Sequence, residues 1–462
     1  MSIDLTLDRI RRLASHLPPY TRPTCHIAGT NGKGSVAALV SSMLATSLSV
    51  GRFNSPHLVS LNDSIAINNE SVSLATYNTT RSEIVEADQE HGTNLSGFEI
   101  LTLTALLIFE RAKVDVVVLE VGLGGRLDAT NIIPDECVLV SALTAVDLDH
   151  QAFLGNTVSA IAAEKAAIAR SGRPFVMGTQ MHVEVEGVVD KVVTAAGAMM
   201  LYALPVFPRD WDPSIDGPQP APFTLSSKET HPPVPVRFAM PCFDHPIRAL
   251  LPLHGEHQLD NLALAVSIVS AAITSSELTP HRSRFTDQSI AQGIKNARWP
   301  GRLSFHTFAL AAESLPILVL ADGAHNPASA ATLGAYLSGF LAPLPKPISL
   351  TYILGVSQAP KKTPAETLGP LLASLDGVDV GAAFVNFSQP EGMPWVHAVP
   401  PVELKEAMKL LRPEITTYLD EGGLRGALEW AMQRNGTGSG LVVVAGSLYL
   451  VADFYRLLEG KK

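Results

Sequence analysis

A glycine-rich run near the N-terminus is the feature that most constrains this chain. The run is His26-Ile27-Ala28-Gly29-Thr30-Asn31-Gly32-Lys33-Gly34-Ser35, and apolar residues then recur at helical spacing over 36–44. Its glycines let successive backbone N–H groups point at an anion, and the helix N-terminus adds the positive end of its dipole. Lys33 supplies a mobile positive charge. The sequence therefore predicts a phosphate-binding loop between a strand and a helix, the alternative being an ordinary glycine-rich turn.

The spacing within this run differs from that of the common GxxxxGK[ST] loop. Gly34 separates Lys33 from Ser35, and no guanine-reading NKxD string occurs in the chain. Both observations argue against a GTPase-type protein. A nucleotide-dependent switch or binding protein stays open as an alternative to an enzyme, because a fold and a motif do not establish catalysis.

Composition narrows the class of protein further. With 462 residues, 46% of them hydrophobic, the chain can bury a large core and is expected to form at least two domains. A formal net charge of −10 disfavours partners such as nucleic acid or an anionic membrane surface. The three cysteines, Cys25, Cys137 and Cys242, lie far apart, which predicts no disulfide framework and a reducing compartment. No apolar run reaches the length of a membrane span, so we expect a cytoplasmic protein, with a mitochondrial pool left open.

Strand-like and helix-like segments alternate along the first part of the chain. Strands are predicted over 114–120, 137–144 and 175–178, and helices over 99–111 and 159–170. This alternation is typical of an α/β fold in which helices wind a mostly parallel sheet.

The amino-acid composition changes over residues 204–246, which are rich in proline. The stretch contains Pro218-Gln219-Pro220-Ala221-Pro222 and Pro232-Pro233-Val234-Pro235. Proline lacks the N–H that a helix interior or a central strand requires, so we expect an exposed, partly flexible insertion here.

A second α/β unit is predicted after residue 302. A helix over 258–272 is followed by Arg298-Trp299-Pro300-Gly301-Arg302, which interrupts the regular pattern. Strands are then predicted over 317–320, 349–354, 382–386 and 441–444. We expect a first domain over 1–298, a linker over 299–302, a smaller second domain over 303–462, and no internal repeat.

Further strings of polar and glycine residues accompany the predicted strand ends. Glu120 ends a β-branched strand and could hold the magnesium of a nucleotide or be an ordinary solvated strand end. The strings are Asn54-Ser55-Pro56-His57-Leu58, Ser96-Gly97-Phe98-Glu99, Gly122-Leu123-Gly124-Gly125-Arg126-Leu127-Asp128-Ala129-Thr130-Asn131, Leu148-Asp149-His150, Glu164-Lys165-Ala166-Ala167-Ile168, Gly255-Glu256-His257-Gln258-Leu259-Asp260-Asn261, Trp299-Pro300-Gly301-Arg302, Asp322-Gly323-Ala324-His325-Asn326-Pro327 and Gly446-Ser447-Leu448-Tyr449.

In this order, and together with the loop at 29–35, these strings resemble those of the Mur ligase superfamily, and in particular its folate branch, the dihydrofolate and folylpolyglutamate synthetases. The resemblance covers nearly the whole chain. It implies a P-loop ATPase domain of the Mur ligase type with a mostly parallel wound sheet, followed by a smaller Rossmann-like α/β domain. The two domains are expected to close around ATP, which would exclude water from a reactive intermediate.

The resemblance also implies roles for individual residues. Ser55 and Glu120 match the ligands of a first magnesium, and His150 with a carbamylated Lys165 match those of a second; Ala167 stands where the family usually has glycine. Taken alone, a lone histidine is usually structural and a lone helix lysine is usually a surface charge. The expected catalytic residues are Lys33, Lys165 and His325. The expected nucleotide-binding residues are Gly29, Thr30, Asn31, Gly32, Lys33, Gly34, Ser35, Asn261, Arg302 and Asp322.

The acid substrate is expected to contact two of the strings. The residues are Ser96, Gly97, Phe98, Glu99, Arg126, Leu127, Asp128 and Ala129. Ser96 and Gly97 weaken the match of the first string, and Phe98 could equally belong to the core.

The implied reaction is ATP-dependent ligation of L-glutamate to 7,8-dihydropteroate through an acyl phosphate, and the alternative is glutamate addition to tetrahydrofolate, alone or as well. Two strings, Arg126-Leu127-Asp128-Ala129-Thr130-Asn131 and Pro390-Glu391-Gly392-Met393-Pro394-Trp395-Val396-His397-Ala398, resemble those of enzymes that use dihydropteroate. ATP and Mg²⁺ at two sites are the implied cofactors, and the resemblance leaves room for a monovalent cation. Small molecules are the only expected partners, and a monomer is expected.

Overall fold

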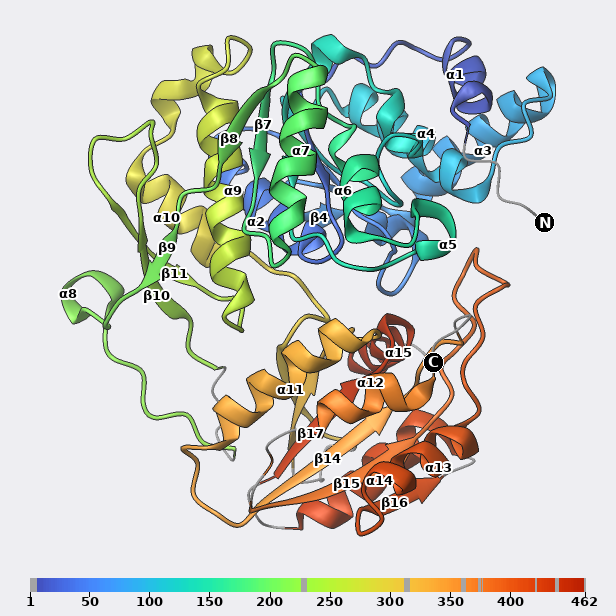
Figure 1. Ribbon diagram of the computed structural model, residues 1–462, viewed down its shortest axis with the longest axis vertical. Helices are drawn as coiled ribbons and strands as arrows, with labels where there is room; N and C mark the ends of the chain where they lie inside the picture. Colours follow the sequence, from blue (N-terminus) through green and yellow to red (C-terminus); the bar gives the residue numbers. More distant parts are fainter. Residues whose placement is uncertain are drawn as a thin grey trace.

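The computed structural model describes residues 6–225, 231–310, 316–358, 363–372, 375, 377–419, 422–436 and 440–460. These residues form two lobes, one above the other in Figure 1. We call residues 6–298, apart from residues 223–225, the first lobe, and residues 303–460 the second lobe. Among the described residues the strands form three sheets, and no helix is both long and apolar enough to cross a membrane.

The first lobe is built on an eight-stranded sheet with the order β4-β3-β2-β5-β1-β6-β7-β8. All neighbouring pairs are parallel except β2–β3 and β3–β4. β1 lies at the centre and is buried along its whole length, as is its neighbour β5. The strands are β1 (Thr24–Ala28), β2 (Val50–Phe53), β3 (Ile65–Ile67), β4 (Glu70–Ser71), β5 (Val116–Glu120), β6 (Val138–Leu143), β7 (Pro174–Met177) and β8 (Met199–Tyr202).

Helices cover both faces of this sheet. On one face α2 and α9 share a core cluster with β1, β5 and β6, and on the other face α6 and α7 pack beside β6 and β7 while α4 packs beside β2 and β5. The helices of the first lobe are α1 (Asp8–Ala14), α2 (Lys33–Leu44), α3 (Leu74–His91), α4 (Gly97–Ala112), α5 (Gln151–Leu154), α6 (Val158–Ala166), α7 (Val183–Ala195), α8 (Pro213–Asp216), α9 (His257–Ile273) and α10 (Asp287–Asn296), with 3₁₀ turns η1 (Leu61–Ser64), η2 (Ala129–Ile132), η3 (Asp135–Cys137) and η4 (Thr279–Arg284).

The proline-rich stretch departs from the sequence-based expectation at its ends. It contributes two strands to a three-stranded antiparallel sheet of β9 (Val206–Pro208), β10 (Val234–Phe238) and β11 (Ile247–Leu251). The middle strand β10 contains Pro235, whose carbonyl accepts a hydrogen bond from the Arg209 N–H (3.0 Å) just beyond the pairing with β9. Val236 and Phe238 are buried in the core cluster of α2 and α9. The expectation that this stretch holds no central strand is therefore wrong at β10, where the proline lies beyond the end of the β9 ladder, while most of residues 207–224 are exposed as expected.

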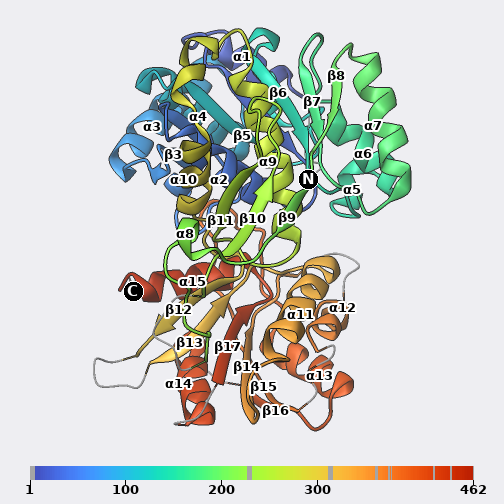
Figure 2. The same ribbon diagram turned by 90° about the vertical axis from the view of Figure 1, so that its left-hand side faces the viewer.

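The middle of the same stretch connects the two lobes. After α8 the chain descends to the second lobe (Figures 1 and 2). Leu225 is buried in the core of that lobe and Phe223 packs against it. Residues 226–230 lie outside the described residues.

The second lobe is a six-stranded sheet with the order β12-β13-β17-β14-β15-β16, parallel except for the β12–β13 pair. Buried clusters lie on both of its faces. Its elements are β12 (Ser304–Phe308), β13 (Ile317–Ala321), β14 (Ile348–Leu354), β15 (Val378–Phe384), β16 (Thr416–Leu419) and β17 (Gly440–Ala445), with helices α11 (Pro327–Leu341), α12 (Pro364–Leu371), α13 (Pro401–Leu411), α14 (Gly423–Asn435) and α15 (Leu448–Leu458). The fold class expected from the sequence, two α/β units with mostly parallel sheets, is confirmed.

Candidate active site between the lobes

The loop after β1 is closely surrounded at each of its three glycines. A Cβ added at Gly29, which has φ +146°, would lie 1.8 Å from the Thr144 side chain. A Cβ at Gly32, with φ +94°, would lie 2.3 Å from Asn261 Oδ1, and one at Gly34 would lie 2.3 Å from the Trp299 ring. Residues of two distant predicted strings therefore pack directly against the loop, and the loop can follow this path only without side chains at these positions.

Backbone contacts hold the loop to the segment that follows β6. The N–H groups of Thr30 and Asn31 donate to the Ala145 carbonyl at 2.9 and 3.1 Å. The Thr30 hydroxyl donates to the Asp147 carbonyl and accepts from the Asp147 N–H, both at 3.1 Å. Asp147 was not among the predicted site residues, and its hydrogen bonds to Thr30 use backbone atoms, which a sequence pattern of side-chain types does not reveal.

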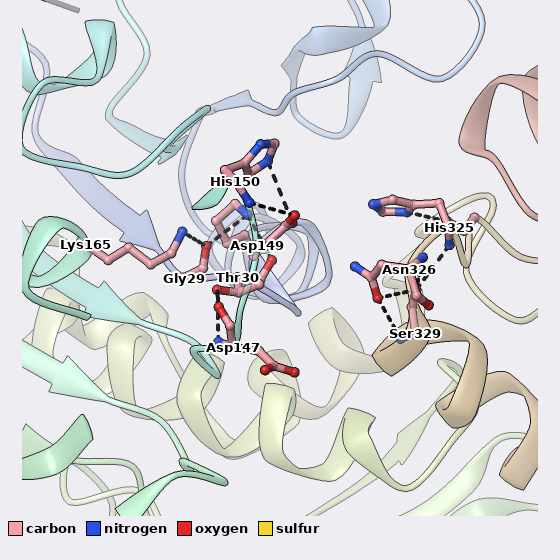
Figure 3. A network of polar contacts seen from close by, with 11 residues as sticks. Gly29, Thr30, Asp147, Asp149, His150, Lys165, His325, Asn326 and Ser329 are labelled. Carbon is pink, nitrogen blue, oxygen red and sulfur yellow. Dashed lines mark hydrogen bonds and ion pairs between the residues drawn. The ribbon is translucent and has the colours of Figure 1, made fainter. Parts of the chain in front are cut away.

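Two lysines converge on this loop, and Figure 3 shows one of them, Lys165, beside Gly29. Lys33 Nζ donates to the carbonyls of Gly29 (3.1 Å) and Thr30 (3.2 Å), and Lys165 Nζ donates to the same Gly29 carbonyl at 2.7 Å. Lys165 is only 3% exposed. Burial, and next the charge of Lys33, lowers the pKa of Lys165 to about 7. The Lys33 ammonium at this loop would be stabilised by an anion, as a phosphate site requires.

Glu120 lies beside this pair at the carboxyl end of β5. It is 4% exposed, and its Oε2 accepts hydrogen bonds from Asn54 Nδ2 (2.8 Å) and from the Ser55 N–H (3.4 Å). Burial raises the pKa of Glu120, and the charges of Lys33 and Arg302 oppose that shift. Asn54 was missed by the sequence analysis, although it directly precedes the predicted ligand Ser55.

This arrangement fits a magnesium ion of the kind that nucleotides carry. Among the described residues no group of three or more His, Cys, Asp or Glu side chains could hold a metal ion. Mg²⁺ in phosphate sites needs few protein oxygens, since phosphate and water complete its octahedron. Glu120 with the neighbouring Ser55 hydroxyl supplies hard oxygen donors of that type, and a cation would offset the cost of burying the carboxylate.

His150 and His325 face each other from the two lobes. His150 precedes α5 with φ +50°, and its backbone N–H donates to Asp149 Oδ1 at 2.9 Å. Partial desolvation lowers the pKa of His150, although its side chain is 51% exposed. The charge of Asp149 opposes that shift, and the charge of Lys165 adds to it. His325 is exposed and contacts the Gly323 carbonyl through Nδ1 at 2.9 Å. Figure 3 shows both histidine rings pointing into the space between the loops.

The start of α9 lies beside the start of α2. Asn261 Nδ2 donates to Gln258 Oε1 at 2.9 Å, and Gln258 Nε2 reaches Ser35 Oγ at 3.4 Å. Both Gln258 and Ser35 are buried. The predicted nucleotide residues Asn261 and Ser35 are thus brought together through Gln258, which belongs to the same predicted string but was given no role.

The carboxylate of Asp322 accepts hydrogen bonds from the backbone around it. Its carboxylate accepts hydrogen bonds from the N–H groups of Leu303 (2.8 Å) and Ala324 (2.9 Å). Arg302 donates to the Gly301 carbonyl at 2.9 Å and lies over Gly323, where an added Cβ would be 2.4 Å from the guanidinium. The structure therefore places Arg302 between the lobes, and a contact of Asp322 with nucleotide stays a prediction.

The first predicted substrate string begins α4. The Ser96 hydroxyl accepts from the Glu99 N–H (3.3 Å), and Glu99 Oε2 accepts from the Ser96 N–H (2.7 Å) and from Arg9 (3.0 Å), which is a capping box. Gly97 is exposed in the first turn. The half-buried Phe98 ring packs over Gly122, where an added Cβ would be 2.3 Å away. Phe98 of this string therefore lies at the loop that follows Glu120.

The second predicted substrate string packs against the helix that carries Lys165. Arg126 pairs with Glu164 at 2.9 Å, and Leu127 lines a pocket of about 50 Å³ together with Leu123, Phe153 and their neighbours. The buried Asp128 accepts from the N–H groups of Leu123 (2.7 Å) and Thr130 (3.0 Å), and Ala129 is buried at the start of η2. Asp128 thus fixes the loop, while Arg126 and Leu127 are the members at its surface.

Comparison with protein families and curated proteins places these observations in a known context. Residues 307–457 match the family model described as "Dihydrofolate synthetase, C-terminal domain". The dihydrofolate synthetase of Saccharomyces cerevisiae is 34% identical over 465 residues, which cover 99% of this chain and 98% of that protein.

Solved structures of similar proteins share the fold of both lobes. E. coli FolC in complex with DHPP and ADP has a TM-score of 0.75 and 26% identity and covers 100% of this chain and 94% of that one. The bifunctional folylpolyglutamate synthase/dihydrofolate synthase of Yersinia pestis, complexed with AMPPNP and Mn ion, has a TM-score of 0.73 and 26% identity, covering 99% of this chain and 95% of that one.

Proposed function

Because the chain belongs to the family of the dihydrofolate synthetases and folylpolyglutamate synthases, we propose that it is an ATP-dependent ligase that joins L-glutamate to 7,8-dihydropteroate. The products are 7,8-dihydrofolate, ADP and phosphate. The observation that carries the proposal is the convergence of Lys33 and Lys165 on the Gly29 carbonyl, beside the buried carboxylate of Glu120. That arrangement combines a phosphate site with a metal site at the ends of adjacent parallel strands.

The residues of the first lobe would bind and orient the triphosphate. Backbone N–H groups at the start of α2 would hold the phosphate oxygens, since those of Thr30 and Asn31 donate to the Ala145 carbonyl. Lys33 would leave the Gly29 and Thr30 carbonyls to neutralise charge that develops on the transferred phosphoryl group. Asn261 would approach the nucleotide from α9. Magnesium bound at Glu120 and Ser55 would supply further charge neutralisation for this transfer.

The remaining residues would handle the activated acid. The benzoate carboxylate becomes an acyl phosphate, and the glutamate amine then displaces phosphate from it. Phe98 would pack against the flat acid substrate above Gly122. Arg302 and His325 approach from the other side of the space between the lobes, where closure would exclude water from the acyl phosphate.

The proposal includes further features of the enzyme. They are a second magnesium at His150 and a carbamylated Lys165, room for a monovalent cation, and a monomeric, cytoplasmic enzyme of two domains split at residues 299–302. The carbamate is supported by the lowered pKa of Lys165, since only a neutral amine can take up carbon dioxide. The reducing compartment is supported by the three dispersed cysteines.

A product assay with two acids tests the function. Purified protein is given ATP, Mg²⁺ and glutamate with either dihydropteroate or tetrahydrofolate, and the products are identified by mass spectrometry. We expect dihydrofolate from the first acid and little product from the second. Lys33→Met serves as the inactive control. Product from tetrahydrofolate alone would overturn the choice of acid, and ATP turnover that does not need glutamate would overturn the ligase.

A further inference from the structure

The loop that follows β2, residues 54–61, belongs to the first lobe but is held by the second. At its start, Asn54 and the Ser55 N–H donate to Glu120. Three residues further on, Leu58 packs against a core cluster of the second lobe that includes residues of α15. The Val59 carbonyl then accepts a hydrogen bond from Arg456 of α15 at 2.8 Å.

Arg456 is part of a connected polar group on the second lobe. Its Nη1 lies 2.5 Å from Asp453 Oδ1. The other oxygen of Asp453 accepts from the Ser388 N–H at 2.7 Å, at the start of a segment that returns toward the first lobe. One carboxylate therefore fixes both the arginine that reaches Val59 and the base of the segment 388–397.

The segment 388–397 also lies beside this loop. The charge of Glu391 acts on His57, and Gly392 lies close enough to Leu61 that an added Cβ would be 3.8 Å from its side chain. The segment has no helix or strand, but the Gln389 amide binds the carbonyls of Met393 (2.7 Å) and Val396 (3.0 Å). These bonds within the segment give it a defined path to the loop.

The short distance along the chain makes this attachment consequential. Ser55 and Val59 are four residues apart, so the chain between them spans at most about 14 Å. Pro56 fixes one backbone dihedral angle within that span. A movement of the second lobe that shifts Val59 can therefore be transmitted over a short stretch of chain to Ser55 and its hydrogen bond to Glu120.

We propose that residues 54–61 couple the position of the second lobe to the geometry of the Glu120 carboxylate, with Arg456 as the positioning residue of this coupling. The metal-dependent part rests on the proposed function, because it takes Glu120 and Ser55 to hold the magnesium of the nucleotide. The structural part, the ordering of the loop by Arg456, does not depend on any ligand.

Hydrogen exchange of the ligand-free protein tests the structural part. Arg456→Met removes the donor to Val59 and keeps most of the aliphatic stem. Because the bond is made by a charged donor, we expect amides of residues 54–61 to exchange about tenfold faster. Arg456→Lys, which keeps a charged donor, should restore part of the protection. Arg434→Met is the matched control, since Arg434 pairs with Asp379 inside the second lobe.

The magnesium dependence of ligation tests the functional part. Arg456→Met should raise the magnesium concentration for half-maximal rate about tenfold, with a smaller change in the rate at saturating magnesium. Leu58→Ala should shift both measurements in the same direction, and thermal unfolding should show that each variant is folded.

The outcomes separate the two proposals. Unchanged exchange over 54–61 in both Arg456→Met and Leu58→Ala would overturn the coupling, and so would equal changes in the Arg434→Met control. Faster exchange with an unchanged magnesium dependence would overturn the proposed effect of the loop on the Glu120 carboxylate. Faster exchange in a protein whose wild type makes no dihydrofolate would leave the loop's ordering by Arg456 supported and the ligase function refuted.

Discussion

The loops that follow β1 and β13 both begin at the carboxyl end of a buried strand but use their polar groups differently. After β1, two lysine ammonium groups converge on one carbonyl oxygen, and burial lowers the pKa of one of them to about 7. After β13, the carboxylate of Asp322 accepts two backbone N–H groups of its own surroundings. Both loops thus bind charged side chains through their own backbone, but the two lysines share one carbonyl oxygen, whereas Asp322 has a separate N–H donor for each of its oxygens.

The largest effect should come from the first of these loops. Lys33→Met removes the mobile charge while leaving the backbone of the loop in place, and we expect ligation to fall about 10²–10³-fold, as for loss of one group that stabilises transition-state charge. Steady-state kinetics with varied ATP measure it. Lys295→Met on the exposed surface of α10 is the control. A rate within twofold of wild type would remove Lys33 from the phosphate site.

The second lysine offers a test by pH. With a pKa of about 7, the Lys165 amine is half neutral near pH 7, and its neutral fraction falls about tenfold for each pH unit below that. Carbamate formation needs the neutral amine, so carbamate and activity should both decline as the pH falls through 7. The ¹³C NMR signal of protein in labelled bicarbonate reports the carbamate, and Lys165→Met is the blank. Full activity in bicarbonate-free buffer with no such signal would refute the modification.

The loop after β13 should respond in stability more than in activity. Asp322→Asn keeps one acceptor oxygen but turns an amide NH₂ toward a backbone N–H, which costs about 1–3 kcal/mol of unfolding free energy. Denaturant unfolding measures this loss, and the KM for ATP should change less than threefold. A large rise in KM with unchanged stability would instead make Asp322 a nucleotide ligand, which would remove the contrast between the loops.

The sequence predicted what depends on local patterns. Strand 114–120 and helix 258–272 agree with β5 and α9 to within two residues. A continuous apolar run and an apolar periodicity can both be recognised in the order of the residues. The glycine loop was predicted for the same reason, because the spacing of its glycines indicates where the backbone turns tightly. By contrast, Asp322 carries the same motif signal whether its carboxylate faces a ligand or a backbone amide, so its use by Leu303 could not be foreseen.

Contacts between distant segments were beyond the sequence. Nothing in the residues around Arg456 indicates that its guanidinium donates to the Val59 carbonyl. The two residues are almost 400 positions apart in the chain. The proline-rich stretch was misjudged for a similar reason: its composition excluded a regular strand locally, while burial of Val236 and Phe238 against α2 and α9 favoured one. Tertiary packing decided both cases.

The smallest effect should come from His325, the exposed histidine of the β13 loop. Its ring contacts the Gly323 carbonyl through Nδ1, so its Nε2 edge is the part that points toward His150 and the first loop. His325→Ala should therefore leave the unfolding free energy within about 0.5 kcal/mol of wild type while raising the KM for glutamate or ATP by less than tenfold, as for one hydrogen bond to a substrate. His325→Gln, which retains a donor, should recover part of that change. Measured KM values for both substrates at a fixed pH check this, and a loss as large as that of Lys33→Met would show that the second lobe supplies chemistry rather than positioning. In that case the two loops would be partners in catalysis, and the contrast drawn between them would hold only for Asp322.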